Sequence, residues 1–183
     1  MSDFPLLQTP RLILRELGPA DLPALFAIHS DAQAMQWFGT DPMTEYRQAE
    51  QLLAQFASWR ALPNPGVRWG IERPSVPGLL GTCGLFKWNR PWRSCAIGFE
   101  LAREAQGQGL MTEALEAILG WGFAHMGLNR IEAQVHPQNL ASLKLLERAG
   151  FVREGVSRQA GYWLGAHHDL VQCSLLRAEA LVD

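Results

Sequence analysis

The sequence is short of charge and of long apolar runs. Only 19% of its 183 residues are charged, and 16 Lys and Arg stand against 18 Asp and Glu, a net charge of −2. This near-neutral balance argues against a broad nucleic-acid footprint, which needs a clustered basic surface. No apolar run reaches the roughly 20 residues that span a bilayer, and no secretory signal is visible at the start. We therefore expect a cytoplasmic protein that contacts neither nucleic acid nor a membrane.

Cysteine is also scarce, in a way that fits a reducing compartment. The chain has three cysteines, Cys83, Cys95 and Cys173, which lie far apart and each inside an apolar stretch. No CxxC pair is present, and no His lies at metal-ligand spacing from a Cys. We expect buried thiols and no metal site.

The remaining composition predicts one packed domain over residues 1–183, because 48% of the residues are apolar. Apolar periodicity and turn residues predict strands over 8–15, 67–73, 79–87, 94–101, 130–135, 151–157 and 170–176, and helices over 21–28, 44–59, 110–124 and 139–149. The three central strands form a meander and should be antiparallel, whereas the strand–helix–strand unit around 95–135 needs a parallel crossover. The expected fold is a mixed-sheet α/β (α+β) domain with helices on both faces.

The most informative segment is the glycine-containing loop at 106–114, which follows a strand and opens a helix. Glycines let a ligand approach the backbone, and the free amides of a first helical turn favour a phosphate. A Walker loop is excluded because no Lys follows Gly109. A dinucleotide-binding motif would need Gly at position 112, where this chain has Thr. The acidic residue that binds the ribose in that motif should stand at the end of a strand, but Glu132, at about the right distance, lies inside one. Two interpretations of the loop remain open: it binds the pyrophosphate of coenzyme A, or it serves only as a turn.

The rest of the chain favours the coenzyme. Its motifs, in order, are residues 9–15 (TPRLILR), 97–101 (IGFEL), 106–114 (QGQGLMTEA), 128–132 (LNRIE), 139–142 (NLAS), 149–155 (AGFVREG) and 162–165 (YWLG) with Asp169. Each block alone is weak, but together they are specific. The sequence resembles the GNAT superfamily of N-acetyltransferases over nearly its whole length, and within it the RimJ/RimL-type branch that acetylates ribosomal-protein N-termini.

The resemblance implies a mixed, mostly antiparallel seven-stranded sheet that splays between its fourth and fifth strands, here 94–101 and 130–135. Acetyl-CoA would lie in this opening as the cosubstrate, with no metal. Its pantetheine would pair with the backbone at Phe99 and Leu101, supported by Asn139. The amides that would hold its pyrophosphate belong to Gln106, Gly107, Gln108, Gly109, Leu110, Met111 and Thr112. The family usually has Gly or Ala where this chain has Met111.

Amide formation needs a neutral amine, stabilisation of an oxyanion and a proton for the departing thiolate. In many relatives a Glu and a Tyr supply base and acid, but this chain has Ala96 and Leu146 there. Glu100 is either an ion-paired strand carboxylate or a base acting through water. Ser142 is either an ordinary helix residue or a hydrogen-bond donor to the coenzyme sulfur.

The acceptor follows from the branch rather than from a motif. The resemblance implies a primary amine, either the α-amine of a protein N-terminus or a small amino compound, with Trp37 and Tyr162 beside the acceptor. A homodimer is the one oligomeric assembly that we consider. Two other classes remain: a non-catalytic acyl-CoA-binding sensor, since the usual Glu and Tyr are missing, and a dinucleotide-dependent oxidoreductase.

Overall fold

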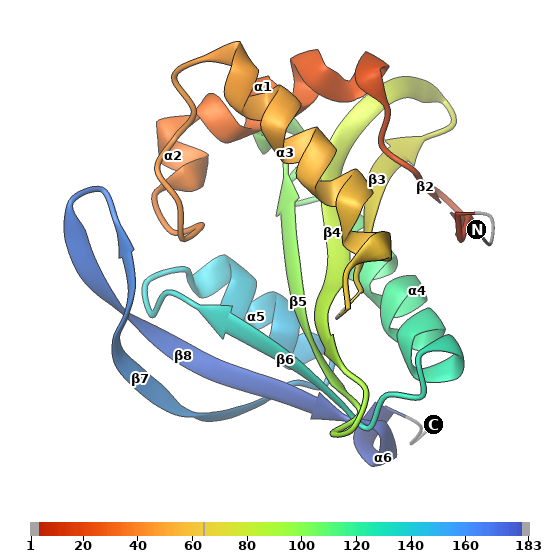
Figure 1. Ribbon diagram of the computed structural model, residues 1–183, viewed down its shortest axis with the longest axis vertical. Helices are drawn as coiled ribbons and strands as arrows, with labels where there is room; N and C mark the ends of the chain where they lie inside the picture. Colours follow the sequence, from red (N-terminus) through yellow and green to blue (C-terminus); the bar gives the residue numbers. More distant parts are fainter. Residues whose placement is uncertain (1–3, 64, 181–183) are drawn as a thin grey trace.

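The computed structural model describes residues 4–63 and 65–180, and in these residues the chain forms one mixed sheet flanked by helices (Figure 1). The sheet has eight strands in the order β1-β2-β3-β4-β5-β6-β8-β7 within the described ranges. Their bounds are β1 (Leu7–Gln8), β2 (Ile13–Arg15), β3 (Val67–Arg73), β4 (Val76–Asn89), β5 (Ser94–Leu101), β6 (Arg130–Val135), β7 (Val152–Trp163) and β8 (Ala166–Leu176).

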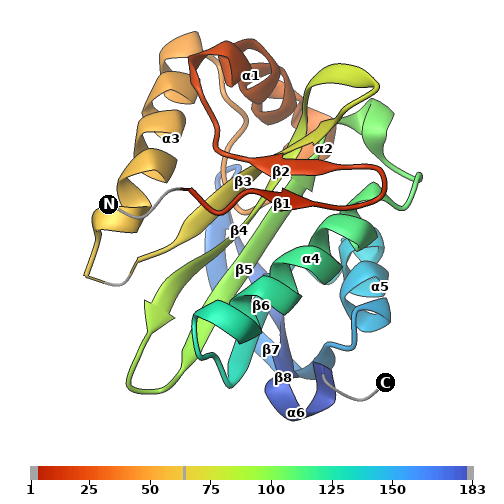
Figure 2. The same ribbon diagram turned by 90° about the vertical axis from the view of Figure 1, so that its right-hand side faces the viewer.

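Helices cover both faces of this sheet, as the sequence predicts. They are α1 (Leu22–Ser30), α2 (Ala32–Met35), α3 (Tyr46–Ser58), α4 (Leu110–His125), α5 (Leu140–Arg148) and α6 (Arg177–Ala180). Consecutive residues of β3 show the two faces, because Trp69 packs edge-on against Trp121 of α4 while the Arg68 guanidinium lies over the Phe56 ring of α3. The helices α1 and α3 therefore lie on one side and α4 on the other (Figure 2).

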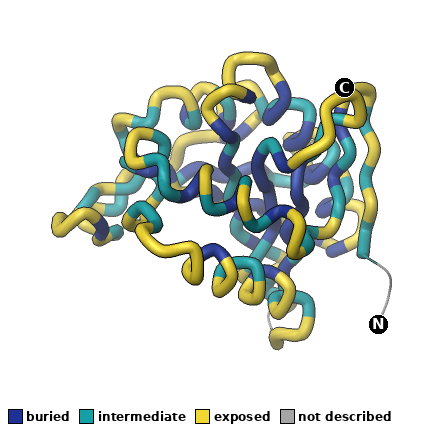
Figure 3. The backbone as a smooth tube through the Cα atoms, turned by 90° about the horizontal axis from the view of Figure 1, so that it is seen from above, coloured by how far each residue is buried: buried dark blue, intermediate teal, exposed yellow. Residues whose placement is uncertain are grey.

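The main core lies between the sheet and α4. Fully buried side chains from β2, β3, β4 and β6 meet Leu115 and Ile118 of α4 there. A smaller cluster of Leu25, Phe56 and Leu79 joins α1, α3 and β4 on the other face. Buried positions accordingly gather in the middle of the molecule, and the outer turns are exposed (Figure 3). None of the described helices is long and apolar enough to cross a membrane.

The mixed, mostly antiparallel sheet is confirmed, since β5 and β6 form its one parallel pair in the described residues. The strand count differs from seven because the strand predicted over 8–15 is two short strands, β1 and β2. Thr9 donates its N–H to the carbonyl oxygen of Leu12 and closes a turn between them. The last hairpin is longer than predicted, and its turn is confined to Leu164 and Gly165, both with positive φ.

The predicted opening of the sheet lies between β5 and β6. The two strands pair only from Ser94 with Arg130 to Ala96 with Glu132. Beyond that point β5 runs on to Leu101 and β6 to Val135 without pairing with each other, although β5 stays paired with β4 and β6 with β8. The two strands diverge like the arms of a V (Figure 1). The free edge of β5 is therefore available to an extended ligand.

Candidate active site

The glycine loop follows the half of β5 that is not paired with β6, after a short 3-10 turn at Arg103–Ala105. Gln106, Gly107, Gln108 and Gly109 are exposed, whereas the side chains of Leu110 and Met111 turn into the core. Gly107 and Gly109 have φ of +73° and +72°, a left-handed conformation that glycine adopts without strain. No described residue accepts a hydrogen bond from the N–H groups of residues 110–112, which begin α4. These amides are free to bind an anion.

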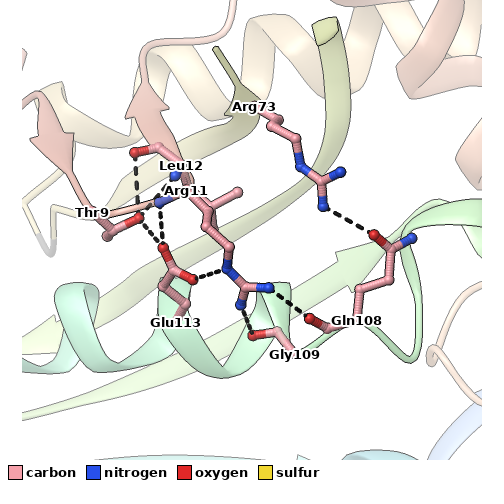
Figure 4. Close-up of polar contacts among 7 residues, drawn as sticks. All are labelled: Thr9, Arg11, Leu12, Arg73, Gln108, Gly109 and Glu113. Carbon is pink, nitrogen blue, oxygen red and sulfur yellow. Dashed lines mark hydrogen bonds and ion pairs between the residues drawn. The ribbon is translucent and has the colours of Figure 1, made fainter. Parts of the chain in front are cut away.

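Two arginine side chains contact this loop from the outside (Figure 4). Arg11, which precedes β2, donates to the carbonyl oxygens of Gln108 at 2.9 Å and Gly109 at 3.3 Å. The Arg11 guanidinium also pairs with the Glu113 carboxylate at 2.6 Å. On the other side, Arg73 donates to the side-chain oxygen of Gln108 at 2.9 Å. Arg11 therefore holds the loop backbone across 97 and 98 positions of the sequence, whereas Arg73, 35 positions from Gln108, contacts one side chain of the loop.

The splayed half of β5 presents different side chains to its two faces. Phe99 and Leu101 pack against the main core on the α4 side, and their backbone lies in the unpaired part of β5. Glu100 points to the opposite face, toward α1. The two residues expected beside the pantetheine thus lie where an added strand would pair.

Glu100 is buried in a polar cluster rather than open to the acceptor. Its carboxylate pairs with the Arg68 guanidinium, accepts from the Thr82 hydroxyl and lies 3.3 Å from Nε2 of His29. Burial alone would raise the pKa of Glu100, but Arg68, His29 and Thr82 outweigh it and hold that pKa at about 2. A carboxylate with so low a pKa is a poor proton acceptor near neutral pH. Of the two interpretations of Glu100, the structure favours the ion-paired one.

The same cluster fixes the backbone of β5. Arg68 also donates to the carbonyl oxygen of Gly98 at 2.9 Å and to the hydroxyl of Thr82 at 2.6 Å. The unpaired half of β5 is thereby held from the α1 side while its edge stays open.

The start of α5 carries two further predicted residues. Asn139 is the N-cap, and its side-chain oxygen accepts from the N–H of Ser142 at 3.1 Å. The hydroxyl of half-buried Ser142 makes no hydrogen bond among the described residues. Leu146, where relatives often have Tyr, is fully buried. Ser142 therefore keeps a free donor one turn into the helix.

An aromatic cluster lies at the end of β6, on the far side of the opening. Trp37, just after α2, stacks on His136 with the ring centroids 4.3 Å apart. Trp163 of β7 and His168 of β8 stack on each other at 3.8 Å and meet His136 edge-on. Trp163 also donates to the carbonyl oxygen of Gln36 at 3.0 Å. The last hairpin is thereby joined to the segment after α2.

His136 is nine-tenths buried, and burial lowers the pKa of its ring, an effect that nearby His168 reinforces and Asp169 opposes. Its Nδ1 lies 3.1 Å from the N–H of Gln138, which donates to it. A neutral ring that accepts on Nδ1 carries its proton on Nε2, so His136 presents a donor.

The two predicted acceptor residues are separated by the structure. Trp37 belongs to the aromatic cluster, but Tyr162 is 64% exposed and packs on His167. Neighbouring strand residues point to opposite faces, so Tyr162 points away from the side taken by Trp163. Sequence reasoning missed Trp163 and gave His136 no functional role. The adjacent Tyr162 and Trp163 at the end of β7 were the sequence feature that could have pointed to Trp163.

Comparison with known proteins agrees with this geometry. Residues 11–152 match the family model described as "Acetyltransferase (GNAT) domain". The chain belongs to the GNAT acetyltransferase family. It is 36% identical to the uncharacterized N-acetyltransferase YoaA of Bacillus subtilis over 174 residues, covering 95% of this chain and 98% of YoaA. This GNAT chain is thus an acetyl-CoA-dependent N-acetyltransferase, as the sequence predicts.

Two further comparisons are with one curated enzyme and one solved structure. Over 91 residues it is 36% identical to the [Ribosomal protein uS5]-alanine N-acetyltransferase of Escherichia coli, covering 49% of this chain and 47% of that enzyme. Its fold superposes on spermidine N-acetyltransferase from Vibrio cholerae, solved with CoA and spermine, with a TM-score of 0.82, 24% identity and coverage of 95% and 100%. A ribosomal-protein acetyltransferase is thus among the relatives of this chain, in agreement with its resemblance to the RimJ/RimL-type branch.

Proposed function

We propose that acetyl-CoA binds in the V between β5 and β6 and that the preferred acceptor is an α-amine, of a protein N-terminus or a small amino compound. One observation carries the proposal: pairing between β5 and β6 stops at Ala96 and Glu132, and the edge of β5 that this leaves open runs toward the loop whose amides at residues 107–112 are free. An extended pantetheine fits that edge as an added strand at Phe99 and Leu101. The pyrophosphate then meets the amides of residues 107–112. The N–H of Gln106, which was predicted to belong to this set, donates instead to the carbonyl oxygen of Arg103 at 3.2 Å.

In this arrangement the acceptor amine attacks the thioester carbonyl carbon, the C–S bond breaks, and the thiolate takes a proton. Asn139 caps α5 and so places the Ser142 hydroxyl toward the sulfur, where it donates as negative charge develops. Trp37 forms one wall for the acceptor, together with the Nε2–H of His136. Tyr162 is proposed to contact only the outer part of a peptide acceptor.

The proposed class of acceptor follows from the absence of a strong base in the proposed site. Making an α-amine of pKa about 8 neutral at pH 7 costs about 1.4 kcal/mol, whereas a lysine amine of pKa about 10.4 costs about 4.6 kcal/mol. Glu100 is committed to Arg68, and Ala96 carries no acid–base group. A site with only water to accept the proton is suited to the amine that is already partly neutral. The ribosomal-protein relative acts, by its name, on an alanine.

Two further parts of the proposal concern the cellular setting. The three cysteines are free and buried, which supports a cytoplasmic enzyme in a reducing compartment. In the described residues the outer edge of β7 has no partner strand, which supports a homodimer as the assembly to test by sedimentation.

The test is an acceptor screen with the full chain. Acetyl-CoA is supplied with peptides of free N-terminus, the same peptides N-terminally blocked, a polyamine and an aminoglycoside, and thiol release is followed. We expect thiol release with the peptides of free N-terminus. Calorimetric binding of acetyl-CoA without release in any arm would indicate an acyl-CoA sensor. Binding of NAD without acetyl-CoA would contradict the coenzyme assignment.

A further inference from the structure

Arg11 makes an unusual set of contacts for a half-exposed arginine. Its guanidinium reaches two consecutive backbone carbonyls of the glycine loop, those of Gln108 and Gly109, and its Nε donates to Glu113 at 2.6 Å (Figure 4). Its own N–H donates to the other oxygen of the same carboxylate at 2.8 Å. The contact is therefore specific for the loop backbone and not for a side chain of the loop.

Peptide geometry gives this contact a consequence on the other side of the loop. Every described peptide bond is trans, so each carbonyl points opposite to the N–H of the same peptide unit. The carbonyl of Gln108 shares its unit with the N–H of Gly109, and the carbonyl of Gly109 shares its unit with the N–H of Leu110. With both carbonyls turned toward Arg11, both N–H groups point away from it, outward from the loop.

We propose that Arg11 is a positioning residue for coenzyme binding, which fixes two loop amides in the direction that a phosphate needs. The inference rests on the proposed placement of the pyrophosphate at this loop. Gly107 and Gly109 allow the left-handed turn but do not by themselves fix one conformation, because glycine is the most permissive residue. A guanidinium that holds two carbonyls removes that freedom before the ligand arrives, and preorganisation of this kind increases affinity.

The surroundings of Arg11 keep the guanidinium in place. Glu113 stands in the first turn of α4, and its carboxylate also accepts from the Thr9 hydroxyl at 2.5 Å. Burial raises the pKa of Glu113, but the bonds from Thr9 and Arg11 outweigh it and lower that pKa, so the carboxylate is ionised near neutral pH. Pairing with Arg11 offsets a negative charge that would otherwise oppose a phosphate at the same helix end.

A planar guanidinium is required for this role. Arg presents several N–H donors in a fixed fork and can bond two carbonyls and a carboxylate together, whereas the point charge of Lys cannot match all three. Arg73 is the natural comparison, because it approaches the same loop but bonds only the Gln108 side chain. The proposal therefore predicts different effects for two arginines on one loop.

The experiment compares Arg11→Gln, Arg11→Lys and Arg73→Gln with the unchanged protein. The affinity for CoA is measured by calorimetry, and pantetheine, which has no phosphate, is measured by displacement of CoA. Loss of charge-assisted bonds predicts that Arg11→Gln weakens CoA about tenfold or more, with Arg11→Lys in between. Arg73→Gln should stay within about twofold, and the affinity for pantetheine should not change with either arginine. Thermal unfolding without ligand reports the fold of each variant.

The outcomes separate the inference from the function on which it rests. Unchanged CoA affinity in Arg11→Gln would overturn the role of Arg11, as would an equal loss for CoA and pantetheine, which would mean general damage to the site. If the unchanged protein binds CoA no more tightly than pantetheine, the loop does not hold the phosphates. That result contradicts the proposed coenzyme placement itself, and it is seen without any variant.

Discussion

At the scale of single residues, Glu100 shows how a neighbour decides what a carboxylate can do. A strand Glu beside the expected coenzyme path has the reach of a general base. Arg68, Thr82 and His29 occupy its oxygens instead, and the low pKa that results removes its value as a proton acceptor at neutral pH. We interpret Glu100 as the group that holds Arg68, and through it the backbone of β5.

This interpretation predicts a loss of stability in Glu100→Gln. The pKa of Glu100 is about 2 in the folded chain against an ordinary 4.5, so the carboxylate stabilises the fold above pH 4.5 and loses this effect as the pH falls toward 2. Breaking a buried pair costs about 3 kcal/mol. Urea unfolding at pH 7, 5, 4 and 3 should show a difference between variant and unchanged protein that shrinks below about pH 4.5.

Glu50→Gln, on the exposed face of α3, is the control and should change the free energy of unfolding little at any pH. A Glu100→Gln protein of unchanged stability whose kcat has collapsed would instead identify Glu100 as the base.

Ser142 supports a second prediction at this scale. The Ser142→Ala variant should lower kcat about tenfold or more with little change in the KM for acetyl-CoA, because its bond to the sulfur strengthens only as thiolate forms. Steady-state kinetics with the preferred acceptor measure both constants. Ser58→Ala, on α3, is the control hydroxyl. An unchanged kcat, with chemistry shown to be rate-limiting, would leave Ser142 an ordinary helix residue.

Local sequence predicted these residues but not their surroundings. Asn139 reads as a cap and Ser142 follows it at helical spacing, so their geometry was accessible from the sequence. The partners of Glu100 come from α1, β3 and β4, and no local pattern connects His29 or Arg68 with position 100. Long-range pairing of this kind decides the pKa, and only the structure supplies it.

At the scale of elements, the junction of β5 with α4 carries the proposed coenzyme site. The strand ends at Leu101, and the left-handed Gly109 caps a helix with free amides. Gly109→Val should therefore abolish acetyl-CoA binding. A branched residue is strained at a φ of +72°, and its Cβ would lie 3.5 Å from a guanidinium nitrogen of Arg11, so the change disturbs the backbone conformation that directs the amides.

Calorimetry with acetyl-CoA tests this change, and circular dichroism verifies that the variant is folded. Gly120→Ala is the matched control on the same helix, since an added Cβ there meets nothing within 4 Å. It should bind acetyl-CoA normally and gain about 0.5–1 kcal/mol of stability. Normal binding by a folded Gly109→Val protein would remove the loop from the coenzyme site.

Elements with strong periodicity were the most predictable. The strands at 94–101 and 130–135 have the predicted bounds, because each is a short apolar run between clear turn signals. The segment 8–15 was wrongly predicted as one strand, since the hydroxyl of Thr9 also bonds within the turn that divides it. The second helix was predicted over 44–59, but Glu45 is its N-cap and it spans Tyr46–Ser58.

At the scale of the whole molecule, the sheet brings together segments that the sequence keeps far apart. Trp37 contacts His136, and Arg11 contacts the loop at Gln108. The residues of each pair lie about a hundred positions apart in the sequence. The antiparallel meander of β3, β4 and β5 and the parallel crossover from β5 to β6 could be predicted, but the place of β8 between β6 and β7 could not. The aromatic cluster could not be predicted either, because its composition depends on how the last hairpin lies against the segment after α2.

In the proposed site Glu100 is paired with Arg68 and position 96 is Ala, so neither supplies a strong base. The acceptor should be an amine that is already partly neutral, and the rate should follow the fraction of free amine as the pH rises through about 8. If binding is equal, the difference in pKa between an α-amine and a lysine amine amounts to about 3.3 kcal/mol, more than two orders of magnitude in rate.

The most direct measurement is the rate of acetyl transfer to one lysine-containing peptide, with its N-terminus free and with it blocked, from pH 6.5 to 9 (a range set by an α-amine pKa of about 8). We expect the free peptide to react more than about a hundredfold faster at pH 7, with a rate that levels off above about pH 8. Equal or faster acetylation of the blocked peptide would contradict the account, because the enzyme would then contain a base strong enough to deprotonate lysine.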